Sequence, residues 1–161
     1  MKQREKQHLL DQLFAQLRTA TDTSEAGEIE RQIWHLWMES GDEHQSRQLR
    51  HGFELMRWGL HDEACRVFTG VIKALPDLAE GWNKRATAHY LRGHYKASIE
   101  DIEETLRREP RHFGALSGWA MICRQLGDRA GELRALRALY ALCPQQQDVQ
   151  RRIDHLEDEA T

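Results

Sequence analysis

Unrelated classes of residue recur along this chain at one spacing, and that spacing constrains the fold more than any other feature. Prolines, glycines, small residues and bulky apolar residues each repeat every 34 residues in the 161-residue sequence. The members are Pro76, Pro110 and Pro144; Gly59, Gly93 and Gly127; Gly52, Ala86 and Ala120; and Phe68, Ile102 and Leu136. Because four different classes share one register, the chain contains an internal repeat.

Each recurring position has a physical role. A glycine can adopt the left-handed conformation that closes a helix, whereas a proline cannot continue a helix and so separates one repeat from the next. Between them lie two segments with apolar residues at helical spacing, which in the middle repeat are Ala79–Leu91 and Tyr95–Arg108. The small residue allows two helices to approach closely. Each repeat is therefore predicted to be an antiparallel helix pair.

A helix pair of this length and punctuation resembles the tetratricopeptide repeat (TPR). Residues 79–112 carry the pattern best, through Trp82, Ala86, Gly93, Tyr95, Ser98, Ile102 and Pro110. Residues 45–78 and 113–146 match less closely, with Gln48 and Glu132 at positions where the family prefers an apolar and a small residue. Phrases such as EGWNKRAT and EPRHFGALSG resemble bacterial members. The resemblance implies an all-α fold, a right-handed superhelix of antiparallel helix pairs.

The segments on either side of the repeats are predicted to complete this α-solenoid. Residues 1–44 form an N-terminal helical hairpin or degenerate repeat, in which Thr23 or Ser24 caps the second helix. The first helix has one apolar face, made by Leu9, Leu10, Leu13, Phe14 and Leu17. Residues 147–161 form a C-terminal capping helix with a narrow apolar stripe and charged remaining faces, as a terminal cap requires.

The resemblance also implies a concave groove lined by the first helix of each repeat. Its predicted residues are Leu49, Phe53, Met56, Asn83, Thr87, Tyr90, Leu91, Ser117, Met121 and Arg124. Apolar anchors mixed with a few directional polar groups suit the binding of a peptide or helix. Asn83 has both a donor and an acceptor for a ligand backbone. The alternative is that Leu49, Phe53 and Met56 pack against the first helix of the chain.

Some TPR proteins bind the carboxylate tail of heat-shock chaperones through cationic groove residues. The corresponding positions here are Leu49, Phe53, Asn83, Gly114 and Gly118, so the cations are absent and a clamp of this type is not expected. Two glycines inside one predicted helix each cost about 1 kcal/mol relative to alanine. We therefore expect a close approach at Gly114 and Gly118, by the neighbouring helix or by a ligand backbone.

Arg85 stands where the family prefers an apolar side chain, and His89 lies one turn later on the same helix face. A buried arginine requires acidic partners, for which Glu54, Asp101 and Glu104 are candidates. The two residues form either a structural ion pair or a buried polar site for an anion or a pH-sensitive contact.

No motif indicates catalysis. HExxH, a phosphate-binding glycine loop and Gly-x-Ser-x-Gly are all absent, so neither an enzyme nor a metal or cofactor is expected. The formal charge of −3 argues against a nucleic-acid partner, and no apolar run is long enough for a membrane span. Cys65, Cys123 and Cys143 form no CxxC and are expected to be free, buried thiols. The predicted location is cytoplasmic, or periplasmic if a leader has been removed.

These observations predict a non-catalytic module or scaffold that binds a protein or peptide in its groove. The alternative is a self-assembling structural protein, a homo-oligomer whose groove is filled by its own N-terminal helix or by another copy. The exposed leucines predicted for the first helix motivate that alternative.

Overall fold

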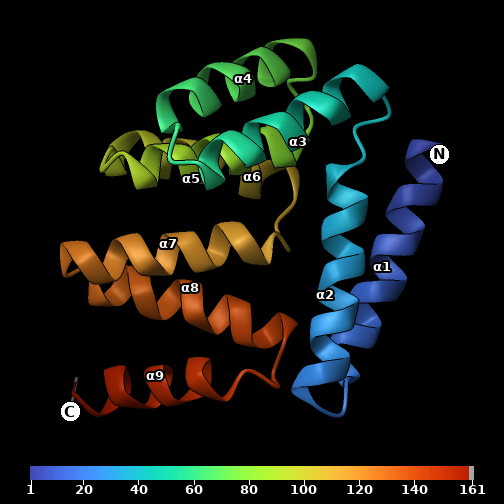
Figure 1. Ribbon diagram of the computed structural model, residues 1–161. Helices are drawn as coiled ribbons and strands as arrows, with labels where there is room; N and C mark the ends of the chain where they lie inside the picture. The colour runs from blue at the N-terminus through green and yellow to red at the C-terminus, as the bar shows by residue number, and fades with distance from the viewer. Residues whose placement is uncertain (160–161) are drawn as a thin grey trace. The chain divides into compact units, whose positions relative to one another are not determined.

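The computed structural model describes residues 1–159, which form helices joined by short turns and contain no strand (Figure 1). The helices are α1 (Gln3–Thr19), α2 (Thr23–Met38), α3 (Glu43–Arg57), α4 (His61–Ala74), α5 (Ala79–Leu91), α6 (Tyr95–Arg108), α7 (Phe113–Leu126), α8 (Arg129–Leu142) and α9 (Gln147–Asp158). The predicted bounds of α5 and α6 are confirmed at both ends. The all-α class is therefore confirmed over the described part of the chain.

Turn chemistry follows the sequence prediction. Gly59, Gly93 and Gly127 have φ angles of 77°, 74° and 73°, the left-handed region that closes a helix. The N-cap prediction for α2 was one residue off, because the side chain of Asp22 accepts the hydrogen bond from the Glu25 N–H at 2.9 Å. A carboxylate at this position satisfies an unpaired backbone donor and complements the helix dipole.

The chain comprises two compact units, each with its own packing. One consists of residues 37–118, and the other of residues 1–36 together with residues 119–159. The boundaries fall inside α2 and α7, so each of these helices contributes residues to both units.

In the 37–118 unit, α3 packs on α4, α4 on α5, and α5 on α6. Helices α3 and α4 pack tightly at Gly52, where an added Cβ would lie 2.7 Å from Cζ of Phe68 and closer still to its Cε1. Phe68 is fully buried. The small-residue position thus allows the close approach that its spacing predicts. At Gly118, by contrast, an added Cβ would meet Ile102 at an ordinary 3.7 Å, so the expected tight approach does not exist at that glycine.

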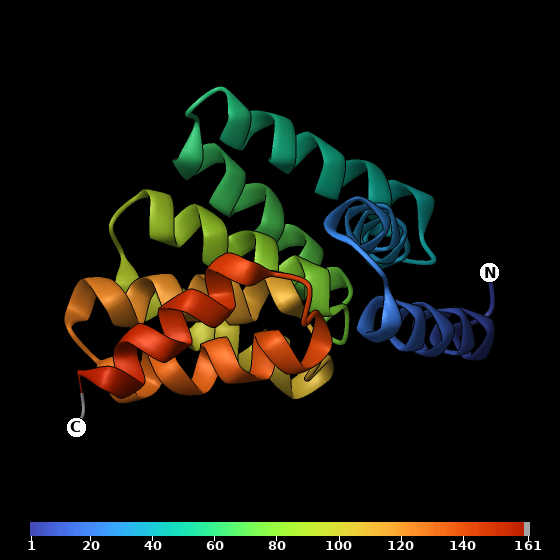
Figure 2. The same cartoon turned by 90° about the horizontal axis from the view of Figure 1, so that it is seen from below.

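In the other unit, α1 and α2 lie side by side as an antiparallel hairpin in both views, and α8 packs on α9 and on α1 (Figures 1 and 2). Leu10, Phe14 and Leu17 of α1 are buried, whereas Leu9 is exposed. The loop after α8 holds the hairpin, since Gln145 donates a hydrogen bond to the Ala20 carbonyl at 2.5 Å.

Candidate protein-interaction face

The predicted groove residues of the 37–118 unit differ in accessibility. Phe53 and Leu91 are 39% and 47% exposed, Thr87 and Ser117 are exposed, and Tyr90 is half-buried. Leu49, Met56 and Asn83 are buried. We define the α3–α5 face as Phe53, Lys84, Thr87, Tyr90 and Leu91, of which Phe53, Thr87 and Leu91 are exposed and Lys84 and Tyr90 are half-buried; Asn83 is a buried polar residue of the same α5 helix.

Leu49 and Met56 belong to the core of this unit. They share a hydrophobic cluster with Phe68 of α4 and with Ala88 of α5. Both side chains therefore stabilise the fold in this structure, and Phe53 is the accessible member of the three apolar residues predicted on α3.

Phe53 is held in place by a chain of polar contacts. The Lys84 ammonium lies 4.7 Å from the centre of its ring, in a cation–π geometry, and 3.2 Å from a carboxylate oxygen of Glu80. The other oxygen of Glu80 lies 2.8 Å from Nε2 of the buried His112, whose ring stacks on Trp37 at 4.0 Å. Burial alone would raise the pKa of the Glu80 carboxyl, but Lys84 and His112 outweigh it and hold the pKa below its ordinary value. The Glu80 carboxylate thus holds the Lys84 ammonium against the Phe53 ring.

Asn83 is the unusual member of this region. The residue is only 5% exposed, and its amide is not one of the enclosed side-chain groups that lack a hydrogen-bond partner within the described residues. The Thr87 hydroxyl donates a hydrogen bond to the backbone carbonyl of Asn83 at 3.1 Å.

The remaining predicted groove residues, Met121 and Arg124, belong to the other unit. Met121 is exposed, and Arg124 is engaged within its own unit, where its Nε lies 2.8 Å from an oxygen of the buried Glu132. Arg152 of α9 binds the same carboxylate with two hydrogen bonds, of 2.8 and 2.9 Å. Hydrogen bonds from Arg152, together with Arg124, hold the pKa of Glu132 below its usual range. The repeat pattern prefers a small residue at this position, and Glu132 can occupy it because two arginines neutralise the charge of its carboxylate.

Arg85 and His89 lie in a second polar cluster, between α4, α5 and α6. The Arg85 guanidinium forms a two-pronged ion pair with Asp101, both bonds being 2.8 Å, and donates to Thr69 at 3.2 Å. His89 lies 3.6 Å from the same carboxylate. Burial, with the nearby Arg85 and Arg92 charges, lowers the pKa of His89 below its ordinary value despite that carboxylate. Of the three predicted acidic partners, Asp101 is the one used.

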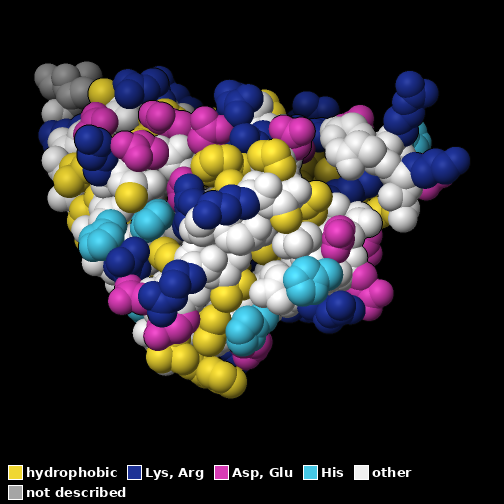
Figure 3. All heavy atoms as spheres, turned by 90° about the horizontal axis from the view of Figure 1, so that it is seen from above, with side chains coloured by type: hydrophobic (Ala, Val, Ile, Leu, Met, Phe, Trp, Pro, Cys, Tyr) yellow, Lys and Arg dark blue, Asp and Glu magenta, His cyan; other side chains and the backbone are white. Residues whose placement is uncertain are grey.

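Sequence reasoning missed Lys84 and the exposed apolar turn between α3 and α4. Lys84 follows Asn83 directly, and a signal for it was available in the helical spacing that places Lys84, Thr87 and Leu91 on one stripe. Trp58 is 71% exposed and Leu60 is 42% exposed. In the space-filling view, apolar side chains protrude at the lower edge, over this turn (Figure 3).

Other kinds of site are not formed within the described residues. Among residues 1–159, no group of three or more histidine, cysteine or acidic side chains is arranged to hold a metal ion. Cys65, Cys123 and Cys143 are free and buried, which confirms the prediction for these thiols. None of the helices in this part of the chain is long and apolar enough to cross a membrane.

Comparison with known proteins establishes the family. No family model matches the chain. A TPR repeat-containing protein of Rhizobium etli is 34% identical over 147 residues, which are 91% of this chain and 72% of that protein. The chain belongs to the TPR repeat-containing proteins. The resemblance drawn from the 34-residue punctuation is thereby confirmed.

Solved structures show the same TPR-type fold. The Yersinia enterocolitica type III secretion chaperone SycD, in complex with a peptide of the translocator YopD, superposes with a TM-score of 0.69 at 12% identity, over 74% of this chain and 97% of SycD. A mutant of MamA superposes with a TM-score of 0.60 at 13% identity, over 98% of this chain and 88% of MamA. At these identities the similarity concerns the fold alone.

Proposed function

We propose that this TPR protein is a non-catalytic interaction module that binds a peptide or helix of another protein on its α3–α5 face. Phe53, Tyr90 and Leu91 supply apolar contacts, and the Asn83 amide pairs with the ligand backbone. The division into repeats at 45–78, 79–112 and 113–146 belongs to the same proposal, as does a contact to Ser117 in the same unit.

The exposed Phe53 ring, which Lys84 and Glu80 hold in place, carries the proposal. Asn83 lies on the same helix as Lys84, and its amide has a donor and an acceptor that match those of a peptide backbone. Because Lys84 already positions the Phe53 ring, binding costs less of the entropy that ordering a contact surface would require. SycD, whose fold is shared, has been crystallised with a peptide, and the present chain is proposed to use its own face in a comparable way.

The test is selection of binders from a displayed random-peptide library, followed by calorimetry with the selected peptides. Loss of an anchoring aromatic residue costs at least about 2 kcal/mol at an interface. We therefore expect Phe53→Glu with Tyr90→Glu to weaken binding by thirtyfold or more, at roughly 1.4 kcal/mol per tenfold. Asn83→Leu, which removes the amide but keeps its approximate volume, is expected to weaken binding while preserving the fold.

The matched control is Trp58→Glu, which changes an exposed aromatic residue outside the α3–α5 face. Circular dichroism confirms that each variant folds. Peptides that bind the Phe53/Tyr90 variant as tightly as the parent, but are lost with Trp58→Glu, would place the binding surface at the α3–α4 turn and refute the proposal.

A further inference from the structure

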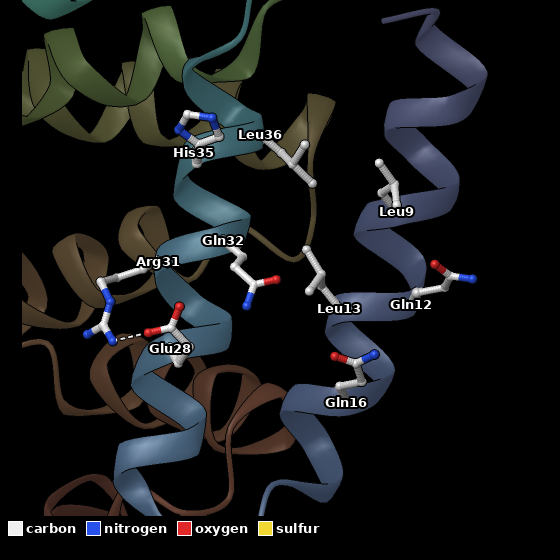
Figure 4. Close-up of a pocket in the computed structure, with 9 residues that line it drawn as sticks. All are labelled: Leu9, Gln12, Leu13, Gln16, Glu28, Arg31, Gln32, His35 and Leu36. Carbon is white, nitrogen blue, oxygen red and sulfur yellow. Dashed lines mark hydrogen bonds and ion pairs between the residues drawn. The ribbon is translucent and has the colours of Figure 1, made fainter.

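A groove runs between α1 and α2 in the unit that contains them. It has a volume of about 620 Å³, and its apolar lining is Leu9, Leu13 and Leu36 (Figure 4). Leu9 is 40% exposed although it lies in the middle of a helix. Figure 4 shows Leu36 pointing from α2 toward α1 and Leu13 lying between the two helices. Of these three leucines Leu9 is exposed, Leu13 is half-buried and Leu36 is buried at the base of the hairpin groove.

The lining changes character along the hairpin. At the end away from Leu9, a second hollow of about 610 Å³ shares Gln16, Glu28 and Arg31 with the first and continues to the α1–α2 turn. At that end it is lined by Asp22, Glu25 and Glu28. His35 lines the first hollow, and Arg31 lines both. Arg31 forms an ion pair with Glu28. The hairpin groove is thus apolar at one end and acidic at the other.

The α1 helix carries the complementary order of side chains. Lys2, Lys6, Leu9 and Leu13 are spaced four, three and four residues apart, which places them along one face of a helix extended back to its N-cap. Two basic residues are followed by two leucines. Glu5, the acidic residue near this face, is turned back to accept a hydrogen bond from the Lys2 N–H at 3.1 Å.

We propose that the hairpin groove binds the α1 helix of a second copy of this chain, antiparallel to its own α1, in a two-fold symmetric dimer. If Leu9 of one copy lies opposite Leu13 of the other, Lys6 of the second copy is level with Gln16, beside Glu28. Lys2 of the second copy then lies one turn farther along, toward Glu25. The same contacts form twice, because the interface of a two-fold dimer is self-complementary.

Charge order selects this occupant. An apolar helix without charges would leave the acidic end unmatched, whereas α1 brings its basic residues there only in the antiparallel direction. A parallel α1 would place Lys2 and Lys6 at the leucine end. The formal charge of −3 gives two copies little long-range repulsion. The dimer uses a surface separate from the α3–α5 face, so Phe53→Glu with Tyr90→Glu should leave it intact, and the two proposals fail independently.

The experiment is sedimentation equilibrium on the full chain and on two charge variants. The groove variant is Glu25→Lys with Glu28→Lys, and the helix variant is Lys2→Glu with Lys6→Glu. Each variant alone sets like charges against each other in the dimer and is expected to be monomeric where the parent dimerises. An equal mixture of the two restores opposite charges at both ends and is expected to form a heterodimer.

Two further variants separate the leucine contact from folding. Leu9→Glu is expected to raise the dimer dissociation constant at least about tenfold, since it removes a leucine buried on each side of the interface. Leu60→Glu, an equally exposed leucine at the α3–α4 turn, is the matched control and should leave association unchanged. Because Glu25 also accepts a hydrogen bond from the Thr21 N–H, Glu28→Lys alone, checked by circular dichroism, provides a variant without that loss.

A parent protein that is monomeric at every soluble concentration overturns the proposal. So does a parent dimer whose two charge variants remain monomeric when mixed, or one that Leu9→Glu leaves unchanged. Dimerisation that weakens with salt, is lost in each charge variant and returns in the mixture supports it.

Discussion

The close contact at Gly52 gives a prediction that opposes ordinary helix propensity. Alanine is favoured over glycine inside a helix by about 1 kcal/mol, so Gly52→Ala would stabilise α3 if local preference alone decided. The added Cβ, however, would lie 2.7 Å from Phe68 Cζ, and Phe68 is fully buried. Forcing a methyl group into a packed core costs about 1–3 kcal/mol. We expect a net loss of up to about 2 kcal/mol in the free energy of unfolding, because the ring must move within a closed cluster.

Gly70 of α4 is the matched control. An added Cβ there meets nothing within 4 Å, so Gly70→Ala should raise the free energy of unfolding by about 0.5–1 kcal/mol. Urea denaturation followed by circular dichroism measures both variants. Phe68→Leu, combined with Gly52→Ala, should cost less than the two single losses together, since residues in contact are not additive. If Gly52→Ala stabilises the protein as Gly70→Ala does, the argument from helix approach is wrong.

Three further outcomes follow from the buried ionisable groups. Glu132→Gln should lower the free energy of unfolding, measured by urea denaturation, by about 1–3 kcal/mol, because two arginines lose a charged acceptor. Glu157→Gln, in an exposed ion pair with Arg137, should change it by about 0.5 kcal/mol or less. The pKa of His89 is lowered in the folded protein, so this residue contributes stability that is present above its unfolded pKa near 6.5 and is lost as the pH falls below that value. In thermal melts, the melting temperature of His89→Gln should therefore fall less steeply with decreasing pH than that of the parent. Burial and the nearby Glu30 raise the pKa of Cys143 to about 11, so mass spectrometry should find this thiol unalkylated at neutral pH until urea is added.

The sequence predicted the repeat and its helices because the determining interactions are local. A left-handed glycine and a proline act within a turn, so the bounds Ala79–Leu91 and Tyr95–Arg108 could be assigned without any tertiary information. The Gly52–Phe68 approach was predictable as well, since both residues recur in the register of the repeat.

The surfaces were predicted less completely, because accessibility depends on which neighbour covers a side chain. Helical spacing placed Leu49, Phe53 and Met56 on one side of α3, but it could not show that Phe68 and its cluster bury the first and third of them. The hairpin groove was not foreseen for the same reason. The spacing of Leu9 and Leu13 shows an apolar face, whereas its partial exposure depends on the separation of α1 from α2.

The charged residues that depart from the repeat pattern have a common physical consequence. A periodic sequence can pack one repeat out of register, because equivalent helices present similar apolar faces. A shift of 34 residues would replace Asp101, the partner of Arg85, with Val67 or Ala135 and leave a part-buried guanidinium unpaired. An uncompensated buried charge costs about 3–5 kcal/mol, whereas the native pair adds little net stability. Arg85 therefore contributes more to the choice among alternative packings than to the stability of the correct one.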